Sequence, residues 1–271
     1  MSIRPVDLPD FAEPPLSEVV LGVQFTPPKG YQSIHAGEVW GLYKDQYPTA
    51  QELPPLPPVF ETFGLRTSGF SRPTFNVVNG LVPSRYWFLR SDGAELIQFQ
   101  QDRLLHNWRK AANESNPYPR FEAMATRFEA ELRKLETYMH TLSSGPLEIN
   151  QCEISYINDI HLGTDQALGA LGWFNFLAFQ GAYPEDLTGT FRETIRDENN
   201  KPQGRLTCEL NTASLAGGQP ILRFALTFRG APPTSGIDSA LDFIAQGRIL
   251  IVKKFTELTT KEAHSIWRRQ S

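Results

Sequence analysis

Five arginines are expected on one face of a β-sheet in the second half of the chain. They are Arg192, Arg196, Arg205, Arg223 and Arg229. All lie in strand-like segments where polar residues alternate with apolar ones such as Leu206, Cys208 and Phe224. Because successive side chains of a strand point to opposite faces of the sheet, the arginines are expected on the face opposite these apolar residues. Guanidinium groups hold phosphates or carboxylates through forked hydrogen bonds. The alternative is a solvated surface whose arginines pair with loop carboxylates such as Asp197 and Glu198, because surface charge usually has no specific role.

Two further segments carry residues of the kind that line binding sites. The candidates are Trp108 and Arg109 in one segment and Tyr156 and Asn158 in the other. Trp, Tyr and Arg are common anchors of binding surfaces. They are also typical of sheet cores in which the polar tips are hydrogen-bonded, and this second interpretation is the more frequent one.

No pattern assigns a catalytic residue, a metal ligand or a cofactor. Ser68 and Ser235 lack the flanking glycine of a GxSxG nucleophile elbow. Asp159 and His161 are expected on one face of a strand and could hold a metal edge-on, but no third ligand lies nearby, so a polar strand end is the better interpretation. No glycines follow the GxGxxG or GxxxxGK spacing of phosphate-binding loops. We therefore expect no cofactor and favour a role other than catalysis.

The composition is that of an ordinary globular protein, with 40% hydrophobic and 21% charged residues among 271. The formal net charge of −4 disfavours a non-specific nucleic-acid binder, which usually carries a basic excess. Cys152 and Cys208 are isolated, as in reducing compartments, and the N-terminal residues lack the apolar core of a secretory signal. Glycines and polar residues interrupt the uncharged stretch 166–184, which predicts a buried helix and not a membrane span. We expect a cytoplasmic protein that does not bind membranes.

The apolar patterns divide the chain into two halves with the same order of elements. Each half is expected to contain a strand, a helix, antiparallel strands and a second helix. In residues 1–145 these are a strand at 18–25, a helix at 34–47, strands at 85–90, 95–100 and 103–109, and a helix at 121–139. In residues 146–271 they are a strand at 153–160, a helix at 166–180, strands at 190–196, 204–213 and 221–229, and a helix at 237–255. A last short helix is expected to begin with a capping box of Thr259 and Glu262.

This order predicts an α+β fold with helices packed on an antiparallel sheet. We expect two tandem modules, 1–145 and 146–271, with the order of elements of TATA-binding-protein-like modules, joined edge to edge or merged into one continuous domain. The similarity is one of topology and carries no function.

Two segments leave alternatives open. The proline run at 53–58 is either a stiff connector or a ligand for an aromatic groove. The helix at 237–255 has apolar residues on more than one side. Either Trp267 and the last helix cover its extra apolar side, or a partner subunit does.

Several short motifs resemble a family of sporadically distributed bacterial proteins whose function is not established. The motifs are Pro14-Pro15-Leu16, residues 98–103 leading into Asn107-Trp108-Arg109, Tyr118-Pro119-Arg120-Phe121 and Tyr156-Ile157-Asn158. The resemblance runs from about Pro14 to the final helix and supplies no catalytic residues. The patchy distribution of the family implies an accessory or mobile gene module.

These observations favour a non-catalytic cytoplasmic interaction protein. We expect it to bind a protein partner, or a second copy of itself, through its sheet surface and the apolar helix at 237–255. The alternative is a binder of an anionic ligand or a nucleic acid that uses the arginine face.

Overall fold

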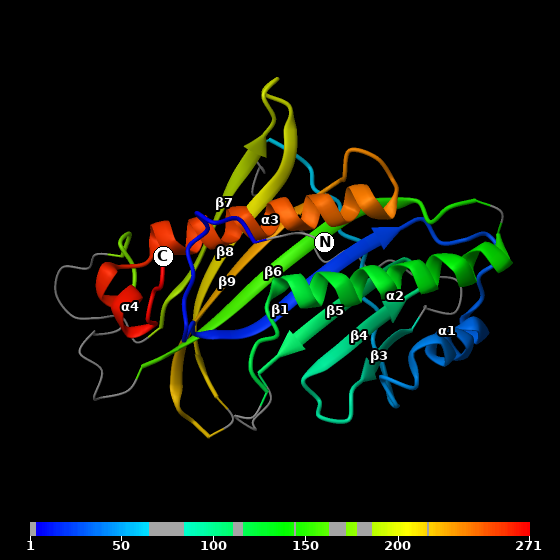
Figure 1. The fold of residues 1–271 in the computed structure, drawn as a ribbon, viewed down its shortest axis with the longest axis horizontal. Coiled ribbons are helices and arrows are strands. Elements are labelled where there is room, and N and C mark those ends of the chain that lie inside the picture. The colour runs from blue at the N-terminus through cyan, green and yellow to red at the C-terminus, as the bar shows by residue number, and fades with distance from the viewer. Residues whose placement is uncertain are drawn as a thin grey trace.

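The computed structural model describes residues 4–64, 84–110, 116–143, 145–162, 172–177, 186–215 and 217–271. The nine described strands form one antiparallel sheet in the order β2-β3-β4-β5-β1-β6-β9-β8-β7 (Figure 1). The strands are β1 Leu16–Phe25, β2 Thr49–Leu53, β3 Arg85–Leu89, β4 Glu95–Gln100, β5 Arg103–Arg109, β6 Ile149–His161, β7 Thr188–Arg196, β8 Pro202–Ser214 and β9 Pro220–Gly230. The helices are η1 Ser33–His35, α1 Ala36–Tyr43, α2 Phe121–Leu142, α3 Ile237–Leu258 and α4 Lys261–Ile266. The expected α+β class with an antiparallel sheet is confirmed.

The centre of the sheet is the pairing of β1 with β6. These strands run antiparallel, with Val19 opposite Tyr156 and Leu21 opposite Ile154. A single hydrogen-bonded ladder therefore connects strands from residues 1–145 with strands from residues 146–271.

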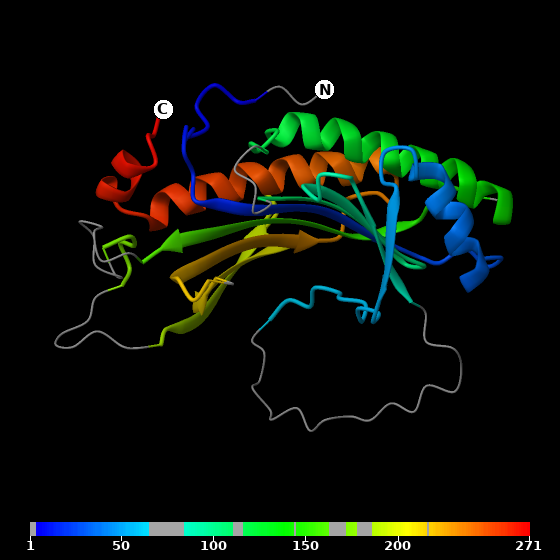
Figure 2. The same cartoon turned by 90° about the horizontal axis from the view of Figure 1, so that it is seen from below.

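The long helices α2 and α3 cover one face of the sheet (Figure 2). Phe128 and Leu132 of α2 and Ile244 of α3 are buried on this side together with Leu21 and other alternate residues of the strands. The opposite face, called the open face below, carries the extended residues 54–64, which we call the strap (Figure 2).

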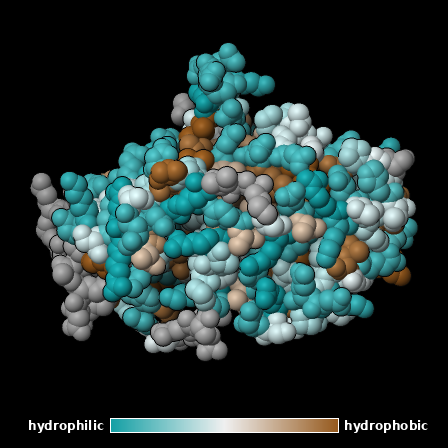
Figure 3. Space-filling view, viewed as in Figure 1, coloured by the Kyte–Doolittle hydropathy of each residue, from teal (hydrophilic) through white to brown (hydrophobic). Residues whose placement is uncertain are grey.

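Helix α3 lies unusually close to the sheet at Gly247. A Cβ atom at this position would come within 2.6 Å of Ile154 Cγ2 and 2.7 Å of Phe228 Cδ1, so a larger side chain does not fit. The far end of α3 is covered by Trp267, the ring of which lies 5.2 Å from that of Phe255. The extra apolar side of α3 is thus covered there within the chain, and the surface over the helices is largely hydrophilic (Figure 3).

Three details differ from the sequence-based expectation. The last helix begins one residue later, because the Thr260 hydroxyl accepts the Ala263 N–H while Thr259 Oγ1 donates to the Phe255 carbonyl and ends α3. Strand β2 was not expected, since its mostly exposed residues show no apolar alternation. Most of the helix expected at 166–180 lies outside the described residues, and 172–177 form turns and one bridge between Phe174 and Thr259.

No helix within the described ranges combines the length and apolarity that crossing a bilayer requires.

Candidate functional site

The predicted arginine face exists, but neighbouring strands neutralise much of it. Arg223 lies directly opposite Asp159 in the ladder between β9 and β6. Its Nε and Nη2 atoms donate to the two carboxylate oxygens of Asp159 at 2.7 and 2.8 Å. Arg229 lies opposite Glu153 in the same ladder and donates twice to Glu153 Oε2, at 2.8 and 2.6 Å.

Arg205 of β8 is buried and forms its ion pair with the strap. Its Nε donates to Glu61 Oε2 at 2.8 Å, and its Nη2 donates to the carbonyl oxygen of Thr62 at 2.6 Å. Arg192 and Arg196 are exposed on β7, and Arg196 donates to the carbonyl of Asn200 at 2.8 Å.

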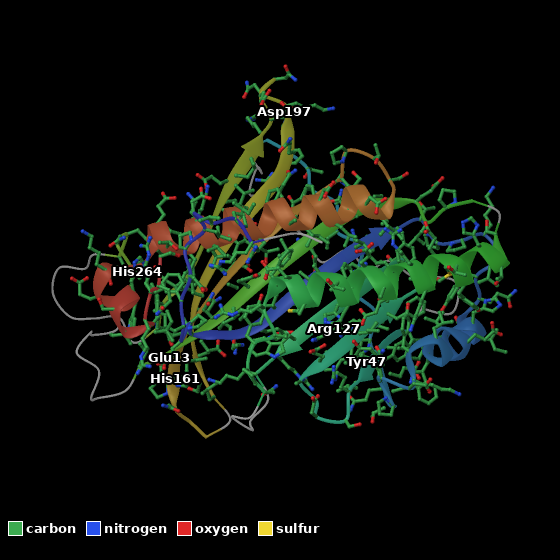
Figure 4. The ribbon with its side chains drawn as sticks, viewed as in Figure 1. Glu13, Tyr47, Arg127, His161, Asp197 and His264 are labelled. Atoms are coloured by element: carbon green, nitrogen blue, oxygen red, sulfur yellow. The ribbon has the colours of Figure 1, made fainter. Side chains whose placement is uncertain are left out.

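The carboxylates expected to pair with these arginines are not the ones that do so. Figure 4 places Asp197 at the tip of the hairpin between β7 and β8, away from the sheet face. The partners of the three paired arginines are instead Asp159, Glu153 and Glu61. Two of these are cross-strand neighbours, which stabilise a sheet far more directly than charges in a distant turn.

The strap is attached to the open face by glutamine side chains that bind its backbone. Gln100 of β4 donates to the Leu56 carbonyl at 3.0 Å and accepts the Leu56 N–H at 2.9 Å. Gln24 of β1 does the same with Val59, at 2.6 and 2.9 Å. Each glutamine amide thus forms two hydrogen bonds with the backbone of one strap residue, one as donor and one as acceptor. A residue on a neighbouring strand forms the same pair of bonds.

The spacing of these contacts follows from the proline content of the strap. Prolines at 54, 55, 57 and 58 lack an N–H, so Leu56 is the one residue among 54–58 that can donate. Leu56, Val59 and Thr62 are three residues apart, which is one turn of a polyproline II helix and about 9 Å of length. Strands β4 and β1 are separated by β5 alone, hence by about 9–10 Å. The distance from Leu56 to Val59 therefore matches the spacing of β4 and β1, the strands whose glutamines bind them.

The strap carries partly exposed apolar side chains and covers a cavity. Val59, Phe60 and Phe63 are 38%, 52% and 39% exposed, although Val59 also lines the cavity and the Phe63 ring lies 5.6 Å from the guanidinium of Arg205. The cavity has a volume of about 300 Å³ and is lined by Pro57 from the strap and by Gly22 and other residues of the sheet.

Arg109 belongs to a polar row on the same open face. Its guanidinium and that of Arg85 each lie 5.7 Å from the centre of the Trp87 indole. Arg85 donates to Gln98 at 3.0 Å, and Gln98 donates to Asn107 at 3.0 Å. Asn107 in turn donates to Glu18 at 2.6 Å.

Trp108, Tyr156 and Asn158 lie on the other side of the sheet, facing the helices. The Trp108 ring is 5.1 Å from that of Tyr118, and the Tyr118 and Tyr156 hydroxyls are 3.0 Å apart. Asn158 is buried and donates to the Phe224 carbonyl at 3.1 Å. The structure therefore separates the predicted site residues into two groups on opposite faces of the sheet.

A buried ionic cluster joins α2 to the sheet. His106 Nδ1 lies 2.9 Å from Glu131 Oε2, and its Nε2 lies 3.5 Å from Glu95. Tyr47 donates to Glu131 at 2.6 Å, and Arg127 donates to Glu95. Burial alone lowers the pKa of His106, but the charges and hydrogen bonds of Glu131 and Glu95 outweigh it and raise the pKa to about 9. The cluster therefore holds a charged imidazole between two carboxylates, with Tyr47 and Arg127 at its ends (Figure 4).

The two cysteine thiols are held in the core of the sheet. Cys152 and Cys208 are buried, and burial raises the pKa of the Cys208 thiol to about 12, which leaves it protonated and inert. Within the described ranges, no three His, Cys, Asp or Glu side chains are arranged to hold a metal ion.

Comparison with family models, with curated proteins and with solved structures gave no match. Function is therefore inferred from the geometry of the chain itself. Sequence reasoning missed Gln24 and Gln100, which bind the backbone of the strap. The only sign of them in the sequence is a polar side chain between apolar residues of a strand. The sequence alone does not show which backbone N–H or carbonyl lies beside that side chain.

Proposed function

We propose that this protein is a non-catalytic cytoplasmic interaction protein that binds a protein partner through the outer side of the strap. The observation that supports this most is the exposure of Phe60, which is 52% exposed on a segment that is anchored from beneath through Val59. Anchoring lowers the entropy that such a segment loses on binding, and aromatic side chains, including phenylalanine, are enriched at protein interfaces.

Binding of an anionic ligand or a nucleic acid by the arginine face has less support. Arg205, Arg223 and Arg229 already contact carboxylates, and an incoming phosphate would have to displace them. Displacement of a buried partner such as Glu61 would leave a charge without compensation.

We also propose that the two halves are tandem modules with TATA-binding-protein-like order. The strand order supports this, because outward from the centre it runs β1, β5, β4 on one side and β6, β9, β8 on the other. In each half, the strand that comes first in the sequence lies at the centre of the sheet. Its neighbour on the outer side is the last strand of that half, and the next strand outward is the second-to-last.

Site-specific photo-crosslinking in the native cell tests the proposed interaction. A photoreactive phenylalanine at position 60 should give a discrete crosslinked product, while the same group at Ile34, which is 80% exposed on the helix side, should not. Mass spectrometry of the product then distinguishes a protein partner from a second copy. The absence of a product at position 60, or equal products at both positions, would overturn the proposal.

A further inference from the structure

A cavity lies between the N-terminal segment, the start of α2 and the middle of α3. Its volume is about 70 Å³. Tyr118, Tyr156 and Asn158 are among its uncharged polar residues, and Leu226, Ile251 and Phe255 are among its apolar walls. The N-terminal segment runs over the helix side of the sheet and contributes one wall (Figure 2).

The base of this cavity contains a buried guanidinium group. Arg248 of α3 is 3% exposed and lines the cavity. Its Nη2 lies 2.9 Å from Glu122, and its guanidinium carbon lies 4.9 Å from the centre of the Phe121 ring. An arginine has five N–H donors, more than one carboxylate contact can satisfy. Buried donors without acceptors are costly, so this group favours an additional acceptor in the cavity.

The remaining charges around the cavity also favour an anion. Arg4 and Arg120 line it, and both contact Asp10, at 3.3 and 2.9 Å. With the pair of Arg248 and Glu122, three cations face two carboxylates. One further negative charge would balance the site. The first turn of α2 adds a favourable dipole, since no side chain caps its N-terminus.

We propose that this cavity binds a small organic carboxylate with an apolar body. The carboxylate would accept hydrogen bonds from Arg248 and from the Tyr118–Tyr156 hydroxyl pair. The apolar body would lie against Leu226, Ile251 and Phe255. A hydrated inorganic anion fits less well, because most of the lining is apolar and offers no partner for its water shell.

Calorimetric titration of the full chain with sodium propanoate, which is small enough for a cavity of about 70 Å³, tests this proposal, with 1-propanol as the uncharged probe of the same length. Propanoate should bind and raise the thermal midpoint, and propanol should bind at least about tenfold more weakly. Arg248→Gln should weaken propanoate binding by about tenfold or more. Lys253→Gln removes a charge from the exposed side of the same helix and should leave binding unchanged.

A second variant keeps the test decisive if Arg248→Gln does not fold. Val252 lines the cavity and is half-buried, so Val252→Phe should fill the cavity and abolish binding in a folded protein. The proposal is overturned if propanoate does not bind the native chain, if propanol binds equally well, or if Val252→Phe binds as tightly as the native chain. It is also overturned if Lys253→Gln weakens binding as much as Arg248→Gln, because the effect would then be one of general charge.

Discussion

Replacing His106 by glutamine should change how the stability of the protein depends on pH. In the folded chain the pKa of His106 is about 9, against 6.5 for an unperturbed histidine. Each pH unit of that difference corresponds to about 1.4 kcal/mol, so the charged imidazole contributes about 3 kcal/mol to the free energy of unfolding. Glu131 and Arg127 face it from α2, Glu95 from β4, and Tyr47 reaches the same cluster.

The sign of the effect follows from the direction of the shift. Because the pKa is higher in the folded than in the unfolded state, the contribution is complete below pH 6.5. It declines as the pH rises from 6.5 to about 9 and is absent above that range. His106→Gln should therefore cost about 3 kcal/mol at pH 6 and much less at pH 9.5.

Urea unfolding at pH 6.0, 7.5 and 9.5, followed by tryptophan fluorescence, measures this difference. His140→Gln is the matched control, since it removes an exposed histidine from the same helix without changing the buried cluster. If the native chain and His106→Gln give parallel stability curves across these three values, the imidazole is not held charged by its carboxylates and the reasoning is refuted.

Three other changes have definite expected outcomes. Gly247→Ala should destabilise the fold by about 1–3 kcal/mol because the added methyl group would clash with Ile154. Gly37→Ala, in the open part of α1, should stabilise the fold by up to about 1 kcal/mol. Thermal unfolding should therefore show a lower midpoint for the first variant and a higher midpoint for the second. Gln24→Leu should release the strap and speed chymotrypsin cleavage at Phe60 without lowering the midpoint of global unfolding. Gln46→Leu, at an exposed glutamine, should change neither the cleavage rate nor the midpoint. Unchanged cleavage of Gln24→Leu would show that Gln24 does not hold the strap. Glu61→Gln should cost about 3–5 kcal/mol because it leaves Arg205 buried without its counter-charge. Arg223→Gln should cost less, because the Arg223 side chain is 46% exposed and water can replace part of its contact with Asp159; equal losses in urea unfolding would contradict this assignment.

The local elements of this fold follow from the sequence because they depend on short-range patterns. Alternation at 18–25, 103–109 and 221–229 predicts three strands that the structure contains, and the apolar spacing from Phe121 predicts α2. The same alternation correctly places Arg205, Arg223 and Arg229 on the side of the sheet away from α3.

The site could not be predicted because its contacts join distant parts of the chain. Glu61 reaches Arg205 only because the strap crosses from β4 to β8, and that path depends on the order of strands in the sheet. The pairing of Arg223 with Asp159 likewise requires the register between β6 and β9. Residue types were sufficient to predict which face an arginine occupies, but not which carboxylate lies beside it.

The central ladder between β1 and β6 also has a consequence for synthesis on the ribosome. Strand β1 leaves the exit tunnel early and can pair with β5, but its other edge has no partner until β6 has been translated. At about 5–20 residues per second, a long apolar edge remains open for several seconds. Such edges recruit strands from other chains. The nascent chain thus passes through a stage at which this edge can pair with other chains, and the synthesis of β6 ends it.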